Sequence, residues 1–242
     1  MTEKIREVNN ELFNWCNSLE NKNDYTNPYL IIPEDNYWKA PIKVLILGKE
    51  TYGWGEKEGY TKQEELENLY IDKINKREFE KGSEPFWDFY FKYIKPIEKE
   101  DANVGICVSN IALLGYPYGI KGYDTNLAKK LSEFLKKYLD ILKTDIIVCF
   151  AGFGTEGYEE ENYVKILNEI FGEYNLKKDT VYENENDKGY PLRELCFPNN
   201  PTKIKLYGTV HPLFIRINLH NEDYIKNTLI NIIIKHKKEL NL

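Results

Sequence analysis

Four short runs of apolar and β-branched residues lie along the chain, and each has the length and composition of a β-strand. The runs are Ile42–Leu47, Val104–Val108, Asp145–Phe150 and Ile204–Val210. The sequence therefore predicts four strands at the centre of the fold.

A helix is predicted between the second and third strands, because apolar residues recur there at intervals of three and four. They are Leu127, Leu131, Phe134, Leu135, Tyr138, Leu139 and Leu142, with Asp124 or Thr125 placed as the N-cap. Further helices are predicted at about Thr2–Leu19, after the capping box Thr61-x-x-Glu64, at Glu159–Phe171 and at Glu222–Glu239. Strands that alternate with helices predict a three-layer α/β/α fold around a central four-stranded, mainly parallel sheet.

The whole chain, residues 1–242, is predicted to form a single α/β domain, because no Pro/Ser-rich linker or internal repeat divides it. Two insertions stand out. Gly55–Lys81 is long, charged and predicted to be helical, whereas Asn175–Asn200 is predicted to form a surface hairpin around Asn184–Gly189. Neither composition indicates a function.

The charge balance argues against a protein that coats polyanions. Lys and Arg number 33 against 39 Asp and Glu, which gives a formal net charge of −6 at pH 7. A local basic groove stays open. The apolar runs are far shorter than the roughly 18 to 20 residues of a membrane span. The start, Met1–Glu7, carries charges where a signal peptide needs apolar residues, so we expect a cytoplasmic protein with no membrane partner.

The four cysteines, Cys16, Cys107, Cys149 and Cys196, form no C-x-x-C pair. This pattern matches neither a zinc site nor an iron–sulfur cluster, and it indicates reduced, mostly buried thiols. Gly152-Phe153-Gly154 lacks the third glycine of a dinucleotide fingerprint, and the chain has no P-loop and no G-x-S-x-G elbow. We therefore expect no metal and no cofactor.

Candidate chemistry gathers directly after the predicted strands. In open α/β sheets, ligands bind beyond the carboxyl ends of the strands. The segments at those ends are Gly48–Trp54, Ser109–Asn110, Ala151–Gly154 and His211–Phe214. Each offers a glycine or a hydrogen-bonding side chain, and four such ends together call for one explanation.

These segments resemble the uracil-DNA glycosylase superfamily, whose members carry a first-strand loop of the type G-Q-D-P-Y or G-E-x-P-G and a last-strand motif H-P-S. This chain has Gly48-Lys49-Glu50-Thr51-Tyr52 and His211-Pro212-Leu213, while Asn110 and Ile146–Gly152 are similar to the family's second and third strand ends. The resemblance covers roughly Lys43 to Arg216. It implies a uracil-DNA glycosylase-like fold and, as partner of a monomeric protein, DNA with a damaged or modified base.

The implied reaction is hydrolysis of the N-glycosidic bond between a base and its sugar, with Glu50 and His211 as catalytic residues. Cleavage leaves cationic character on the sugar and negative charge on the departing base. Glu50 would stabilise the sugar cation and orient or deprotonate the attacking water, and His211 would donate to the base oxygen. The alternatives are that Glu50 is a loop carboxylate paired with Lys49 and that His211 is a buried structural histidine.

The target atom is inaccessible within a duplex, so the nucleotide must be flipped into a pocket. The resemblance places Gly48, Tyr52, Phe86 and Asn110 around the base. Phe86, or else Trp87, would stack on the base, Tyr52 would block its C5 position, and Asn110 would contact its Watson–Crick edge. The alternatives are that Phe86 belongs to a core helix face with Phe89, Tyr90 and Tyr93, that Tyr52 packs under its loop, and that Asn110 caps a turn.

DNA contacts are expected in the segment after His211. Leu213, Phe214 and Ile215 could form an apolar wedge that fills the vacated base stack, and Arg216 could reach a phosphate. A plug of core residues at a helix start is the alternative.

Three departures from the family pattern bear on the substrate. Thr51 stands where proline is common, Leu213 where serine is usual, and Glu50 replaces the aspartate of the best-known branch. A catalytically inactive glycosylase-like fold that binds nucleic acid or a nucleotide is therefore the competing hypothesis, and a different modified base is a third.

Overall fold

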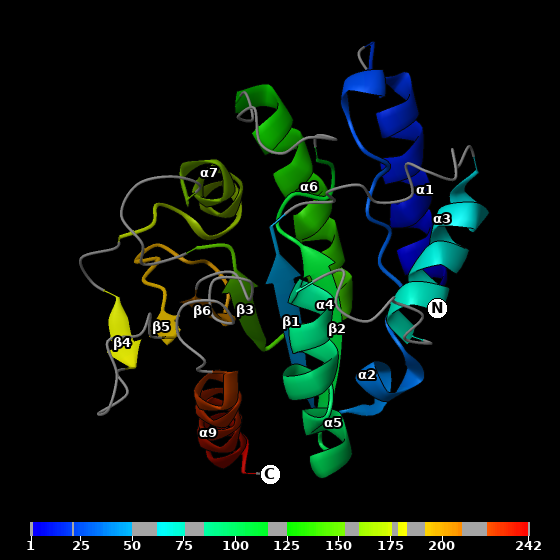
Figure 1. Cartoon of the computed structure of the whole chain (residues 1–242). Coiled ribbons are helices and arrows are strands. Elements are labelled where there is room, and N and C mark those ends of the chain that lie inside the picture. Colours follow the sequence, from blue (N-terminus) through cyan, green and yellow to red (C-terminus); the bar gives the residue numbers. More distant parts are fainter. Residues whose placement is uncertain are drawn as a thin grey trace.

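A six-stranded sheet forms the centre of the computed structural model, which describes residues 2–20, 22–49, 62–75, 85–115, 125–152, 160–175, 179–182, 192–209 and 222–241. The strands are β1 (Ile42–Gly48), β2 (Val104–Asn110), β3 (Ile146–Phe150), β4 (Thr180–Tyr182), β5 (Leu192–Glu194) and β6 (Lys205–Thr209). Their order across the sheet is β2-β1-β3-β6-β5-β4 (Figure 1).

The four predicted strands are confirmed, and they form the parallel part of the sheet, β2-β1-β3-β6. The expected strand number needs correction, because the hairpin predicted within Asn175–Asn200 does not stand apart. Its strands β4 and β5 pair antiparallel with each other, and β5 pairs antiparallel with β6. The edge of β6 that does not face β3 thus gains a backbone partner. The sequence did not predict β4 and β5 as strands of the sheet, because three residues are too few to show a periodic pattern.

Helices cover both faces of this sheet. They are α1 (Glu3–Ser18), α2 (Asp35–Lys39), α3 (Gln63–Tyr70), α4 (Pro85–Phe89), α5 (Ile97–Glu100), α6 (Thr125–Leu142), α7 (Glu160–Phe171) and α9 (Glu222–Leu240), with shorter helical turns at Lys22–Asp24, Ile71–Asn75 and Tyr90–Ile94. Phe150 of β3 packs against Phe89 of α4 on one face. On the other face Gly105 of β2 lies against Tyr37 of α2, whose hydroxyl donates to Leu142 at the end of α6.

The start of α3 differs from the predicted capping box. The helix begins at Gln63, and the Lys62 N–H donates to Glu65 Oε2 at 3.0 Å, so Glu65 is the capping carboxylate rather than Glu64. Thr61 lies outside the described residues. Residues 63–75 are helical, which agrees with the prediction for this part of the Gly55–Lys81 insertion.

A fully buried asparagine fixes the N-terminal helix α1 to the rest of the fold. Asn9 Nδ2 donates to the backbone oxygen of Ile31 at 3.3 Å and to Glu67 Oε1 of α3 at 3.1 Å. Its Oδ1 accepts from the Tyr138 hydroxyl of α6 at 2.6 Å. Because a buried amide is costly without partners, these bonds specify how α1, α3 and α6 pack.

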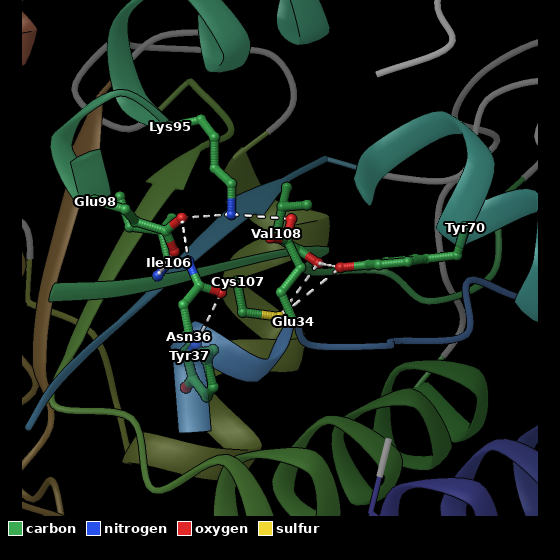
Figure 2. A network of polar contacts seen from close by, with 9 residues as sticks. All are labelled: Glu34, Asn36, Tyr37, Tyr70, Lys95, Glu98, Ile106, Cys107 and Val108. Carbon is green, nitrogen blue, oxygen red and sulfur yellow. Dashed lines mark hydrogen bonds and ion pairs between the residues drawn. The ribbon is translucent and has the colours of Figure 1, made fainter. Parts of the chain in front are cut away.

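Strand β2 lies at the edge of the sheet, and side chains cover its outward backbone groups (Figure 2). The Ile106 N–H donates to Glu98 Oε1, and the Tyr70 hydroxyl donates to the Val108 oxygen at 3.0 Å. Burial raises the pKa of Tyr70 well above its usual value, so this hydroxyl stays a donor. Unpaired edge strands invite pairing with other chains, and these two bonds occupy part of that edge.

Glu98 is also the centre of a buried ion cluster. Its Oε2 accepts from Lys95 Nζ at 2.6 Å and from Asn36 Nδ2 at 2.8 Å, and Lys95 Nζ lies 3.1 Å from Glu34 Oε1. The side chains of Lys95 and Glu98 are only 8% and 5% exposed. The pair is therefore shielded from solvent, so each charge is stabilised by its ion-pair and hydrogen-bond partners and not by water.

Replacing Glu98→Ala is expected to lower the free energy of unfolding by about 3 kcal/mol, because Lys95 loses a buried partner and the Ile106 N–H loses its acceptor. The matched control is Glu133→Ala, whose carboxylate pairs with Lys130 at 2.8 Å on the exposed surface of α6. That loss should cost less than about 1 kcal/mol. Urea unfolding of both variants measures the difference, and equal losses would contradict the buried cluster.

Candidate functional site

Four residues form a row across the carboxyl ends of the parallel strands: Asn110, Gly48, Phe150 and Thr209. We call them the strand-end row. Gly48 pairs in register with Asn110, and Phe150 with Thr209. Val44 and Ile46 pair with Ile146 and Val148, so Gly48 and Phe150, two residues further on, share one level and one face. Three inter-strand spacings make the row roughly 14 Å long.

Asn110 and Phe86 meet directly above Gly48. A Cβ atom added to Gly48 would lie 2.5 Å from Asn110 Oδ1 and 3.4 Å from two ring atoms of Phe86. Only glycine leaves room for this close approach. Three of the residues singled out in the sequence, from β1, α4 and β2, are therefore brought together.

The aromatic stretch at α4 divides between core and site. Trp87, Phe89 and Tyr90 are buried in the hydrophobic core, as the alternative interpretation of this stretch expects. Phe86 is only partly buried, with its ring 4.9 Å from that of Trp87 and 6.2 Å from that of Phe150, both at near right angles. Phe86 thus lies where the aromatic core meets the strand-end row.

Thr209 closes the row at its other end and escaped the sequence analysis. Its side chain is fully buried, and among the described residues Oγ1 has no hydrogen-bond partner. A buried hydroxyl without a partner costs about 1–3 kcal/mol, so it marks a place where another polar atom is needed. The predicted strand Ile204–Val210 ended one residue later, so no sequence signal distinguished Thr209 from the other residues of that strand.

Backbone bonds hold the strand ends in place beyond the sheet itself. The N–H groups of Ile111 and Ala112 donate to the oxygens of Gly48 and Lys49, at 2.9 and 3.0 Å. Gly152, whose φ is 96°, donates from its N–H to the Thr209 oxygen at 3.1 Å. The positive φ explains why glycine follows the third strand.

The other candidate site residues lie outside the described residues: Glu50, Tyr52, His211, Leu213, Phe214 and Arg216. Their roles, and the convergence of Glu50 with His211, therefore stay predictions. In the sequence, Glu50 follows Lys49 at the end of β1, and His211 stands two residues after Thr209.

The buried cysteines Cys16, Cys107 and Cys149 are poor nucleophiles. Cys107 and Cys149 are buried within β2 and β3, and Cys16 is buried in α1. Burial raises the pKa of the Cys107 thiol to about 12 and those of Cys16 and Cys149 well above their usual value. The thiolate is the reactive form, so covalent chemistry at these thiols is disfavoured near neutral pH. The expectation of mostly buried free thiols is confirmed.

Within the described part of the chain, no group of three or more His, Cys, Asp or Glu side chains is arranged to hold a metal ion. None of the described helices combines the length and apolar character needed to cross a membrane. Comparison of the sequence with protein-family models finds no match, and neither does comparison with curated proteins.

Gly48→Ala should destabilise the protein by about 1–3 kcal/mol, because the new methyl group displaces the Asn110 amide. In an Asn110→Ala background the same substitution should cost at least about 1 kcal/mol less, since the clashing atom is gone. Chemical denaturation of the single and double variants measures this coupling.

Gly105→Ala is the control for that cycle. Its Cβ would lie 2.6 Å from the Tyr37 Cα on the opposite face of the sheet, so its cost should not depend on Asn110. An unchanged cost of Gly48→Ala in the two backgrounds would contradict the contact between Gly48 and Asn110.

Proposed function

We propose that this protein is a DNA glycosylase with a uracil-DNA glycosylase-like fold, which hydrolyses the N-glycosidic bond of uracil or another modified base flipped out of DNA. The observation that carries the proposal is the meeting of Asn110 and Phe86 above Gly48. An aromatic face beside an amide with donors and an acceptor suits a flat heterocycle with polar edges.

Each of the three residues has a distinct part in holding the base. Phe86 stacks on the base, and Asn110 hydrogen-bonds to its Watson–Crick edge. Gly48 leaves the space that both require. Stacking on one face and hydrogen bonding at one edge is the way in which enzymes hold a base extruded from a duplex. Tyr52 blocks the C5 position of the bound base.

Glu50 and His211 perform the bond cleavage in this proposal. The Glu50 carboxylate stabilises the oxocarbenium-like centre of the sugar and orients or deprotonates the attacking water. His211 donates to the carbonyl oxygen on which negative charge develops as the base departs. The water supplies the hydroxyl group to the sugar, and its proton passes through Glu50 toward the departing base.

A binding protein without cleavage activity is the second candidate function. Thr51, directly after Glu50, and Leu213, two residues after His211, depart from the family motifs. These departures favour a fold that holds a nucleotide through Asn110 and Phe86 without hydrolysing it. The net charge of −6 also disfavours association with DNA, which is itself a polyanion.

Incubation with oligonucleotides that each carry one altered base, followed by alkaline cleavage of abasic sites, distinguishes the two functions. Strand breaks at one or more bases are expected of the glycosylase. Glu50→Gln and His211→Ala should each lower the single-turnover excision rate by about 10²- to 10³-fold while DNA binding stays within a few-fold, because both act mainly in the transition state. Asn110→Ala should instead change the preference among bases.

Intact folding of each variant is checked by circular dichroism. Excision by Glu50→Gln and His211→Ala at the wild-type rate would contradict their catalytic roles. A negative result across the whole panel of bases, together with measurable DNA binding, would support the binding protein.

DNA affinity is expected to fall as salt concentration rises despite the net charge of −6, because phosphate contacts release counterions. The slope of log affinity against log salt between about 50 and 200 mM gives the number of phosphate contacts. Fluorescence anisotropy with a labelled duplex measures it. Binding that ignores salt would indicate a small-molecule ligand in place of DNA.

A further inference from the structure

We propose that the Thr209 hydroxyl binds the sugar–phosphate part of the nucleotide whose base lies against Asn110 and Phe86. The inference rests on the proposed function and extends it from the base to the whole nucleotide. Its starting point is a fully buried hydroxyl at the end of β6 that has no hydrogen-bond partner among the described residues.

Register places Thr209 on the same face of the sheet as the proposed base site. Thr209 is the in-register partner of Phe150, and Phe150 lies at the level of Gly48. Two strands, β1 and β3, separate Thr209 from Asn110. A single flat base held against Asn110 and Phe86 does not reach across both strands, whereas the sugar and phosphate attached to that base extend beyond it in the direction of the row.

The chemistry of the row changes from one end to the other in a way that fits a nucleotide. Asn110 and Phe86 offer an amide and an aromatic face at the end that holds the base. Phe150, fully buried beside Phe86 and Phe89, separates the two polar ends of the row with an apolar side chain. Thr209 ends the row with a hydroxyl that can donate to a phosphate or sugar oxygen.

Hydrogen bonds hold the backbone of Thr209, so the position from which its side chain extends is fixed. Its oxygen accepts from the Gly152 N–H at 3.1 Å, and its strand pairs with β3 throughout. Because the side chain is fully buried in the ligand-free protein, a nucleotide can reach the hydroxyl only when the groups that cover Thr209 move aside. A duplex bound at the surface without flipping should not contact it.

The test uses two labelled duplexes that differ at one position, where one carries a tetrahydrofuran abasic residue and the other a normal nucleotide. The abasic residue keeps the sugar and phosphates but has no base, so its preferential binding reports the sugar–phosphate end alone. Wild-type protein should bind the abasic duplex more tightly. Thr209→Val, which keeps the shape but removes the hydroxyl, should lose about tenfold in affinity for that duplex only.

Two further variants separate the ends of the row. Thr209→Ser keeps a hydroxyl and should retain the preference for the abasic duplex, whereas Asn110→Ala should leave that preference unchanged because no base is present. The melting temperature of ligand-free Thr209→Val should equal or exceed that of the wild type, since no partner in the protein is lost. A clearly lower melting temperature would show that the hydroxyl is already bonded within the protein and would overturn the assignment.

The outcomes also separate this inference from the proposed function. Base excision by the wild type, together with an unchanged abasic preference in Thr209→Val, would overturn the role of Thr209 and leave the glycosylase standing. Absence of any abasic preference in the wild type would likewise overturn it. Loss of the preference in Thr209→Val from a wild type that excises no base would support the nucleotide anchor and count against catalysis.

Discussion

The in-register alignment of four parallel strands is the constraint on which the rest of the structure depends. Parallel strands must be covered on both faces, so the chain has to cross over through helices such as α6 each time it returns to the sheet. All four carboxyl ends then lie at one edge. Asn110, Gly48, Phe150 and Thr209 become neighbours in a row because of that alignment and not because of their spacing in the sequence.

Buried polar groups of this fold differ in whether they have hydrogen-bond partners among the described residues. Asn9 bonds to three partners and fixes how three helices pack. Glu98 bonds to a lysine, an amide and the edge of β2. Thr209 has no such partner among the described residues. Trp38 Nε1 and Arg193 Nε also lack partners there, so it is the position of Thr209 in the strand-end row that makes its hydroxyl the one proposed to bind a ligand.

Sequence patterns predicted the parts of the fold that are long and periodic, including the four parallel strands and α6. They located the 175–200 hairpin but did not predict that it extends the central sheet. Strands as short as Thr180–Tyr182 join the sheet through backbone bonds, which leave no side-chain pattern in the sequence. Gly48, Phe86 and Asn110 were found from strand ends and family motifs. Thr209 was missed because a threonine inside a β-branched run looks like any other strand residue.

Phe86 shows why composition alone could not separate core from site at α4. Consecutive aromatic residues in a short helix point in different directions, so Trp87 and Phe89 enter the core while Phe86 stays partly exposed beside Gly48. A buried aromatic platform holds Phe86 through its contacts with Trp87 and Phe150. A stacking side chain must be rigid before the ligand arrives, since ordering it on binding would cost affinity. In the proposed function, the core packing of α4 thus helps to hold Phe86 ready for a flat ligand.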